Sequence, residues 1–577
     1  MTTSSAQDDL YLTEECVERQ ESYVFTVSKE IQEVTDEEYD RIYSILSNAN
    51  IELDVSAPIY KMTWGHLIAS HHGRLLNLVL LYLRLETIVS KQNIETIVCD
   101  SDLDRAYISV AQDIASEYNI GINSETNSIS KLDFIQRFLK NTFLITPFFL
   151  NQILTYIWGI LSWETDETEL LFIPSLGRLG SALPVLNKIA NGEYENYKVL
   201  ISSKVSPLGR TWKWKYLKHT LNDHDLSPLT ESTSIRCMSK QVRSYLQASK
   251  SLLFKSELSN ELNIVLEENL DIQLDETIRY SIYEGYRTRT LLSIFFYHTS
   301  KNAIKTRKCK KMVIGGLSPS RRAMLYAGIE NDCEVYYIPH GINPASTSPN
   351  PPKELIHFVS GDLEKTYYSE STQVQEEWTR IATGRPYLTE LYQERGKTDT
   401  SNSSAYTGQI LVATQPLPGR KELVNDVVSV ARDQGMDVVI KTHPSETREM
   451  YSEYAEQSEV IQVTESDLFK HIRDSDVTVT INSNVGLESI VAGTPIIAMN
   501  KWKPLVMDPL YVKNGPISVV RDIDDLCTEI EKIDSDSIKN IQKTQFYFIN
   551  QNFELDTDAA QNIVDEILQD NYTIQIG

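Results

Sequence analysis

The chain has 577 residues, with 55 Lys and Arg against 80 Asp and Glu, which gives a net charge of −25. This length predicts roughly two to four domains, and the acid excess, spread along the chain, argues against nonspecific binding to nucleic acid or anionic lipid through bulk charge. The six cysteines are scattered without a C-x-x-C pair, which indicates reduced core thiols in a cytoplasmic protein. The polar, acidic N-terminus predicts no signal peptide.

The first half of the chain predicts an α/β domain. Residues 1–55 are acidic and helical in pattern, and we expect a variable extension there. Over 56–395, short apolar strands alternate with helices, the pattern of a parallel sheet covered on both faces. Insertions that are mostly helical or irregular are expected at about 120–165 and 205–310. The expected strands are 95–99, 170–173, 198–201, 312–314 and 335–338.

An uncharged stretch at 141–163 is long enough to span a bilayer. Pro147, Asn151 and Gln152 interrupt it, so we expect a buried helix or one lying at the membrane surface rather than a span. The protein is therefore expected in the cytoplasm, with a peripheral contact at the inner face of the membrane left open.

A polar segment at 396–408 predicts a flexible linker. The strand expected at 409–413 then begins a second alternating unit, 409–577, whose last helix is a candidate to cross back to the first. We therefore predict an α/β fold with two facing Rossmann-like domains and helical insertions in the first.

The most informative segment of the second unit is 476–499, which predicts strand, tight turn, short helix and second strand. The strand expected at 477–481 is β-branched and uncharged, Ser483 stands at the helix cap, and Gly493 stands where the helix should end. Backbone N–H groups and the positive end of this helix would meet at one point, which suits a phosphate. Glu488 is near enough to the turn to meet sugar hydroxyls. An ordinary crossover with a capping Ser is the alternative.

A second turn follows the strand expected at 438–441. Pro444 suits the first position of a helix and Glu446 the third, where its side chain reaches back to the cap. His443 occupies the cap position, where it is better explained as a donor to a ligand oxygen than as a helix stabiliser. Lys441 either assists or is the solvated end of its strand. We expect both turns to follow neighbouring strands and to converge outside the carboxyl edge of one sheet, as a donor-nucleotide pocket.

These segments resemble a known group of proteins. T-I-N-S-N-V-G-L-E-S-I-V-A-G-T-P-I-I, I-K-T-H-P and I-L-V-A-T-Q are similar to capsular polysaccharide transferases that use CMP-Kdo. More broadly, they resemble bacterial sialyltransferases and teichoic-acid glycerophosphotransferases, which share the two-domain glycosyltransferase-B (GT-B) fold. The resemblance is strong over 409–500 and negligible over 1–300. It is weaker over 311–395, where Y-I-P-H-G-I and I-A-T-G-R-P-Y-L carry it.

The resemblance implies roles for particular residues. His443, Pro444 and Ser483 would contact the donor's nucleotide and phosphate, and Glu488 its ribose. The family often has Ser-Ser or Ser-Thr where this chain has Ser483 and Asn484, whose amide can still donate to a phosphate oxygen. Helix ends and side chains would stabilise the leaving phosphate, so neither a metal nor another cofactor is expected.

Two residues are candidates for the base that activates the acceptor hydroxyl. His340 precedes Gly341 after a buried strand, as in the His-Gly pair of teichoic-acid-type enzymes, and a purely structural turn is the alternative. Asp102 belongs to a D-x-D sequence after the strand expected at 95–99, and could offer a base on the acceptor side. A lone D-x-D is a weak signal, and a solvated loop that caps the next helix is the alternative.

The acceptor side is less defined. Arg210 and Lys213 lie in the dense basic and aromatic cluster of 209–219, which could hold a lipid phosphate or sugar rings. A solvated helix with half-buried Trp is the alternative. Arg321 follows a Gly-Gly pair near an expected helix start, where it either touches phosphate or belongs to a surface pair.

Together these features predict a metal-independent glycosyltransferase. It would move a sugar from a nucleotide-activated, CMP-linked donor to a glycan, a surface polysaccharide or a lipid-linked acceptor, with no nucleic-acid partner. A CDP-polyol phosphotransferase is one alternative, because the His340 and His443 pair allows it. An isomerase like UDP-N-acetylglucosamine 2-epimerase is another, although its expected Ser-Gly-Gly and paired Glu are missing near Ser483. A non-catalytic sugar-binding relative is the third. The sugar, the acceptor and the oligomeric state stay open.

Overall fold

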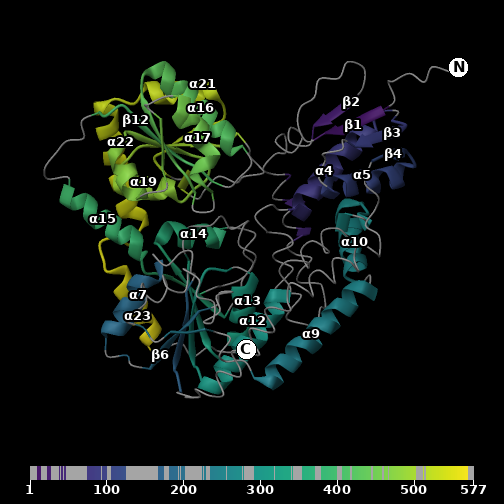
Figure 1. The fold of residues 1–577 in the computed structure, drawn as a ribbon, viewed down its shortest axis with the longest axis horizontal. Coiled ribbons are helices and arrows are strands. Elements are labelled where there is room, and N and C mark those ends of the chain that lie inside the picture. The colour runs from purple at the N-terminus through teal and green to yellow at the C-terminus, as the bar shows by residue number, and fades with distance from the viewer. Residues whose placement is uncertain are drawn as a thin grey trace.

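A computed structural model describes three parallel sheets, each packed against helices (Figure 1). The residues that it describes are 9–13, 23–26, 38, 41–42, 45–46, 74–92, 94–99, 105–124, 167–174, 181–192, 194, 196–201, 224, 226–228, 234–254, 257–275, 277–278, 291–317, 319–339, 341, 354–370, 379–398, 406–415, 419–443, 446–457, 461–464, 467–501, 511–512 and 515–569.

The C-terminal sheet has six parallel strands in the order β14-β13-β12-β15-β16-β17. Its strands form from short β-branched runs that are buried on both faces. Helices α16, α17 and α21 cover one face, and α18 and α19 cover the other, backed by α15 and α22. The strands are β12 (Gln409–Ala413), β13 (Asp437–Lys441), β14 (Ile461–Thr464), β15 (Val477–Thr480), β16 (Ile496–Met499) and β17 (Ser518–Val520). The helices are α15 (Pro386–Thr398), α16 (Arg420–Gln434), η5 (Arg448–Tyr451), α17 (Ser452–Gln457), α18 (Leu468–Asp474), α19 (Val485–Ala492), α21 (Ile523–Glu531) and α22 (Ser535–Asn552).

The central sheet has seven parallel strands in the order β11-β10-β9-β8-β5-β6-β7. Helices α12 and α13 pack on one face, and α7 and α23 pack on the other. The strands are β5 (Leu170–Ile173), β6 (Tyr197–Ile201), β7 (Leu226–Pro228), β8 (Lys311–Gly315), β9 (Glu334–Ile338), β10 (Leu355–Val359) and β11 (Thr379–Ala382). The helices are α7 (Leu183–Asn191), α9 (Ile235–Phe254), α12 (Leu291–Arg307), α13 (Pro319–Ile329), α14 (Asp362–Glu370) and α23 (Ala559–Leu568).

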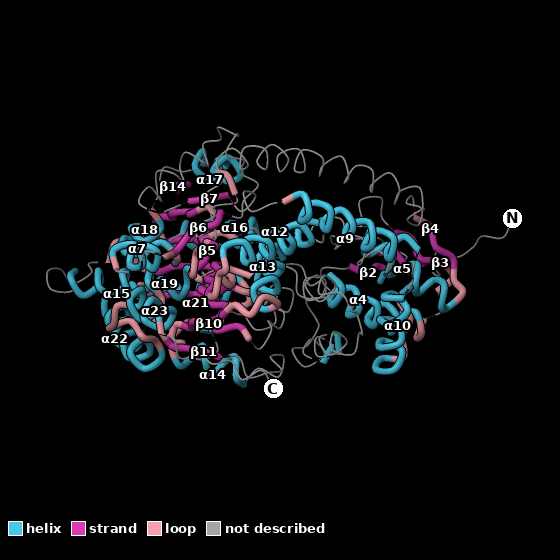
Figure 2. Tube along the Cα trace, turned by 90° about the horizontal axis from the view of Figure 1, so that it is seen from below, coloured by secondary structure: helices cyan, strands magenta, loops and turns pink. Residues whose placement is uncertain are grey.

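The N-terminal sheet was not expected. It has four parallel strands in the order β2-β1-β3-β4, with a core of its own that includes α4, α5 and α10. Both views show this sheet well apart from the other two, with the long helix α9 leading toward it (Figure 2). Its elements are β1 (Asp9–Thr13), β2 (Tyr23–Thr26), α4 (Arg74–Val89), β3 (Thr96–Cys99), α5 (Arg105–Tyr118), β4 (Gly121–Asn123) and α10 (Glu257–Leu270).

Two expectations for the N-terminal part are therefore wrong. The acidic segment 1–55 begins with two strands where we expected only a helical extension, because Leu10 of β1 is buried in the N-terminal core; its described residues from 38 to 46 are helical as expected. The strand expected at 95–99 is β3, and it pairs with β1 and β4 rather than with the strands of the central sheet. The loop that carries Asp102 thus follows a strand of a different sheet from the one that we predicted, although Asp102 itself lies outside the described residues.

The predicted fold class is confirmed. Two parallel sheets, the central and the C-terminal one, are each covered by helices on both faces, as in two Rossmann-like domains. A long helical segment, α9, α10 and α12, lies between β7 and β8, where a helical insertion was expected, although α10 packs in the N-terminal core and α12 covers the central sheet. The uncharged stretch 141–163 lies outside the described residues, and none of the helices that the structure describes combines the length and apolar character needed to cross a membrane.

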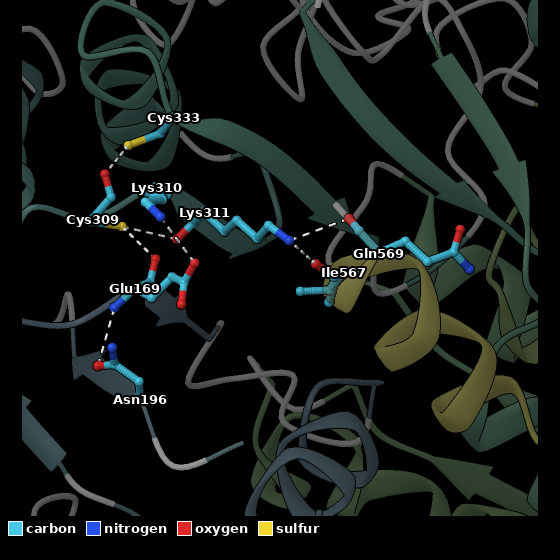
Figure 3. Close-up of polar contacts among 8 residues, drawn as sticks. All are labelled: Glu169, Asn196, Cys309, Lys310, Lys311, Cys333, Ile567 and Gln569. Carbon is cyan, nitrogen blue, oxygen red and sulfur yellow. Dashed lines mark hydrogen bonds and ion pairs between the residues drawn. The ribbon is translucent and has the colours of Figure 1, made fainter. Parts of the chain in front are cut away.

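The last helix, α23, packs on the central sheet although it follows the C-terminal one. Ala560, Ile563, Val564 and Ile567 lie in the core between this helix, α7 and the strands. Buried Lys311 of β8 holds the end of α23, since its Nζ donates to the carbonyl oxygens of Ile567 (2.9 Å) and of Gln569 (3.3 Å), as Figure 3 shows. An ammonium group at a helix C-terminus complements the negative end of the helix dipole.

We expect Lys311→Met to lower the free energy of unfolding by about 2 kcal/mol, because two carbonyl oxygens lose a charged donor in a buried place. Urea denaturation measures this loss. The control is Lys310→Met at the neighbouring position, where the side chain is 75% exposed and its Nζ lies 3.5 Å from Glu169, as Figure 3 also shows. That control should change stability by less than about 0.5 kcal/mol. Equal losses in the two variants would contradict the role of Lys311.

Candidate functional site

The candidate site lies at the carboxyl edge of the C-terminal sheet, where the strand order reverses. The chain passes from β12 outward to β13 and β14, and then returns to place β15 on the other side of β12. In open α/β sheets, ligands bind in the crevice beside such a reversal. Our expectation that β13 and β15 are neighbours is wrong, because β12 lies between them and pairs with both.

The end of β12, between the ends of β13 and β15, contributes residues that were not predicted from the sequence. Gln415 follows β12, and its Nε2 donates to Asn482 Oδ1 (2.9 Å) while Asn482 N donates to Gln415 Oε1 (3.0 Å). This reciprocal pair bridges the ends of β12 and β15 at the point of reversal. The signal available in the sequence was the polar pair Thr414 and Gln415, which directly follows an apolar strand.

The turn between β15 and α19 has the expected form. Val477–Thr480 is buried throughout, and Gly493 ends the helix with a φ of 85°, a left-handed conformation that favours glycine. Asn484 is the N-cap residue, while Ser483 Oγ accepts a hydrogen bond from Val485 N (3.2 Å). The helix therefore begins one residue later than we predicted, and Ser483 satisfies one of its first N–H groups.

Glu488 lies one turn into α19. It is half-buried, and its Oε2 is shielded from water and accepts no hydrogen bond from the described residues. Burial raises the pKa of this carboxyl to about 7. The hydroxyl of Tyr387 on α15 is also buried without a hydrogen-bond partner among the described residues, and burial followed by the charge of Glu488 raises the pKa of Tyr387. Such unsatisfied buried polar groups call for an explanation, and a bound ligand that hydrogen-bonds to them is one.

The turn after β13 is held by a buried carboxylate. Glu446 Oε2 accepts hydrogen bonds from His443 N (3.1 Å) and from Thr414 Oγ1 (2.6 Å), so it reaches back to His443 as expected. The helix expected from Pro444 is wrong, because the next helical element begins at Arg448 with Thr447 as its N-cap. Glu446 Oε1 accepts a bond from Tyr451 OH (3.1 Å) and lies 3.4 Å from Arg420 Nε. Glu446 therefore positions the backbone of His443, whose side chain is half-buried. The first helical element after this turn is η5, and Pro444 lies outside the described residues.

Lys441 stands at the end of β13. Its Nζ donates to the carbonyl oxygen of Thr442 (2.8 Å), and the side chain is half-buried. This contact agrees with a strand end and leaves both predicted roles of Lys441 open.

The central sheet brings a second turn to the same place. A Cβ on Gly341 would lie 2.7 Å from Cγ of Asn484, so the backbone that follows β9 touches the start of α19. On its other side this turn is fixed, because Arg385 Nη1 donates to the carbonyl oxygen of Pro339 (3.2 Å). Arg385 also forms a buried ion pair with Glu364 (2.6 Å). His340 lies between Pro339 and Gly341, outside the described residues.

The predicted acceptor residues are only partly described. Arg321 lies in the first turn of α13, and its Nη2 lies 3.5 Å from the carbonyl oxygen of Pro174, beside the reversal of strand order between β5 and β8. Arg210 and Lys213 lie outside the described residues. Over the described part of the chain, no group of three or more His, Cys, Asp or Glu residues is arranged to hold a metal ion.

The central and C-terminal sheets form two Rossmann-like units, the arrangement that defines a GT-B fold, and their carboxyl edges meet where Gly341 lies against Asn484. The four-stranded N-terminal sheet is an addition to these two units. No family model matches the chain, and a search of curated proteins found no match.

Solved structures match it at low identity. UDP-GlcNAc 2-epimerase from Neisseria meningitidis is 14% identical over 70% of this chain and 99% of its own, with a TM-score of 0.40. The wall teichoic acid polymerase TagF is 13% identical over 76% of this chain and 98% of its own, with a TM-score of 0.39. A glycosyltransferase from Rickettsia africae is 13% identical over 70% of this chain and 100% of its own, with a TM-score of 0.38. Likenesses of this strength assign no activity.

Proposed function

We propose that the chain is a metal-independent GT-B glycosyltransferase with a nucleotide-sugar donor. The observation that carries this proposal is the pairing of two features on α19. Its N-terminus, the positive end of the helix dipole, lies at the carboxyl edge beside the point of strand reversal, where a phosphate is favoured. One turn further on, Glu488 offers a buried oxygen that no described protein group uses, as a ribose diol requires.

The predicted residues would have different roles in the proposed donor site. Ser483, Asn484 and His443 would neutralise the charge that develops on the leaving phosphate, in a place where fixed donors are more effective than water. Glu488 would accept hydrogen bonds from ribose hydroxyls. Lys441 and Pro444 would border this pocket, with Glu446 holding the backbone of the turn.

The reaction also needs an acceptor and a base. We infer that the central sheet, built from β5 to β11 and covered by α23, belongs to the acceptor domain, and that the C-terminal sheet, β12 to β17, belongs to the donor domain, joined through 396–408. His340 is the proposed base, supported by the contact of its neighbour Gly341 with Asn484. Arg321, Arg210 and Lys213 are the proposed contacts to a glycan or lipid-linked acceptor, at the cytoplasmic face of the membrane. The proposed donor is CMP-linked, on the resemblance of the donor segments.

A CDP-polyol phosphotransferase is the second candidate, and one observation favours it. The turn that carries His340 lies against the N-terminus of α19, where the donor phosphate is proposed to bind. A base in that place could activate a hydroxyl for attack at phosphorus as well as at a sugar carbon.

We expect at least one of CMP, CDP, UDP, UMP and GDP to stabilise the wild-type protein, because a ligand that binds only the folded state raises its stability. At 100 times Kd the gain is about 2.7 kcal/mol. His443→Ala should weaken the binding of that nucleotide at least tenfold, or about 1.4 kcal/mol. The control is Arg432→Ala, an exposed change in the last turn of α16. Thermal shift and calorimetric titration measure both effects.

The outcomes separate the candidates. If none of the five nucleotides stabilises the wild type, the donor-site proposal fails. Stabilisation by UDP alone would overturn the CMP assignment, and a clear preference for CDP over CMP would favour the phosphotransferase.

A further inference from the structure

Among the contacts between the central and C-terminal units, the backbone of Gly341 lies so close to the Asn484 side chain that position 341 admits no side chain. Gly341 is buried, and a Cβ there would lie 2.7 Å from Cγ and 3.0 Å from Oδ1 of Asn484, and closer still to Nδ2. Cβ atoms essentially never approach other heavy atoms within 3.0 Å. Any larger residue at 341 therefore has to turn the Asn484 amide away or move the two sheets apart.

The Gly341 side of this contact is held firmly. Arg385 donates to Pro339 O, and its partner Glu364 accepts hydrogen bonds from Ser360 N and Ser360 Oγ, both at 2.8 Å. Arg385 is 3% exposed and Glu364 is not exposed at all, so the ion pair cannot relax into solvent. The turn is thus tied to β10 and to the segment after β11.

The Asn484 side is held as well. Asn484 O accepts the first helical bond of α19 from Glu488 N (3.0 Å), and Ser483 O accepts bonds from Gly486 N (3.1 Å) and from Tyr511 OH. The backbone that carries the Asn484 amide is therefore as constrained as the turn that it faces. A small displacement of either segment therefore changes how the Gly341 backbone and the Asn484 amide fit together.

We propose that Asn484 couples the donor site to the turn of the central sheet, with Gly341 as the residue that makes the coupling possible. The Asn484 amide lies between the proposed phosphate position at the N-terminus of α19 and the backbone next to His340. A bound donor that orders this amide would also set the position of the turn. A displacement of the turn that moves the amide would in the same way weaken donor binding. This inference rests on the proposed function for its ligand, while the contact itself does not.

The test is a double-mutant cycle with Gly341→Ala, Asn484→Ala and the double variant, read out on nucleotide affinity by calorimetric titration. The atoms of Asn484 nearest to the added Cβ all lie beyond its own Cβ, so alanine at 484 removes the clash. We expect Gly341→Ala to weaken binding about tenfold in the wild-type background and less than about twofold in the Asn484→Ala background. Independent, additive losses would overturn the proposal.

A second readout needs no nucleotide. Without ligand, the added Cβ of Gly341→Ala meets only the amide end of the Asn484 side chain, so it should lower the urea midpoint only slightly, and Asn484→Ala should remove that difference. Additive midpoint shifts would overturn the contact, and absence of nucleotide binding to the wild type would instead overturn the proposed function. The matched control is Gly192→Ala at the end of α7, where φ is −84° and the chain leads to the opposite edge of the sheet. This control should leave nucleotide affinity unchanged.

Discussion

Arg385→Ala is expected to lower the free energy of unfolding by about 3–5 kcal/mol, because it leaves the carboxylate of Glu364 buried without its cation. Arg385 Nη2 donates to both oxygens of Glu364, at 2.6 and 2.8 Å. Burial raises the pKa of Glu364, but the charges of Arg385 and His357 and the hydrogen bonds from Ser360 and Arg385 together outweigh it, so the pKa lies below its ordinary value. The variant also frees Pro339 O and with it the turn next to His340. Urea denaturation with circular dichroism measures the loss.

An exposed ion pair provides the control for this prediction. Lys308 and Glu167 form a pair whose side chains are 70% and 65% exposed. Lys308→Ala should change stability by less than about 1 kcal/mol, because water screens and replaces such a pair. A loss of less than about 1 kcal/mol for Arg385→Ala would contradict the buried character of the Arg385–Glu364 pair.

Glu488→Gln is expected to stabilise the ligand-free protein above pH 8, by about 2–3 kcal/mol. The pKa of Glu488 is about 7 in the folded protein against an ordinary value of 4.5, and the difference is worth about 1.36 kcal/mol for each pH unit. The folded state therefore binds more protons than the unfolded one between these values, and the wild type loses stability as pH rises through them. Glutamine keeps the shape but carries no charge. The advantage of the variant should vanish below about pH 4.5, as measured by denaturation at a series of pH values.

Glu488→Gln should weaken ligand binding, although it should stabilise the ligand-free protein. A carboxylate accepts hydrogen bonds from two ribose hydroxyls, whereas an amide accepts fewer. We therefore expect Glu488→Gln to lower the affinity for the nucleotide that the wild type binds by about tenfold at pH 8. Nucleotide binding to the wild type should improve as pH rises through about 7, because the ionised form of Glu488 is then populated.

A carboxylate with the opposite shift serves as a control. Asp534 caps α22, and hydrogen bonds from Ser537 lower its pKa. Asp534→Asn should be less stable than the wild type at neutral pH, and the difference should shrink as pH falls through the folded pKa. An advantage of Glu488→Gln that stays constant between pH 4 and pH 9 would rule out titration of Glu488 as its cause.

Local patterns were sufficient to predict the donor half of the chain. An uncharged β-branched run predicts the strand Val477–Thr480, and Gly493 adopts the positive φ that ends α19. Glu446 reaches back three residues to His443 N, as the spacing predicts. Each of these features depends on neighbours within one turn of the chain, so sequence alone determines it.

Contacts between distant segments decided the rest. The position of β12 between β13 and β15 depends on how the helices cross over the sheet, which no local pattern records. The acidic composition of the N-terminal segment suggested a helix, but Leu10 is buried and its segment forms strand β1. Strand formation depends on packing more than on intrinsic preference.

The sequence by itself determined two Rossmann-like units, the turns at their carboxyl edges and the residue types in those turns. Only the tertiary structure brought Gly341 against Asn484 and Tyr387 beside Glu488. The physical reason is that hydrophobic periodicity directs each element to bury one face, but does not specify its partner. Which elements pack together depends on complementary shape and on polar groups that satisfy each other, such as the Arg385–Glu364 pair that holds the turn of the central sheet in place.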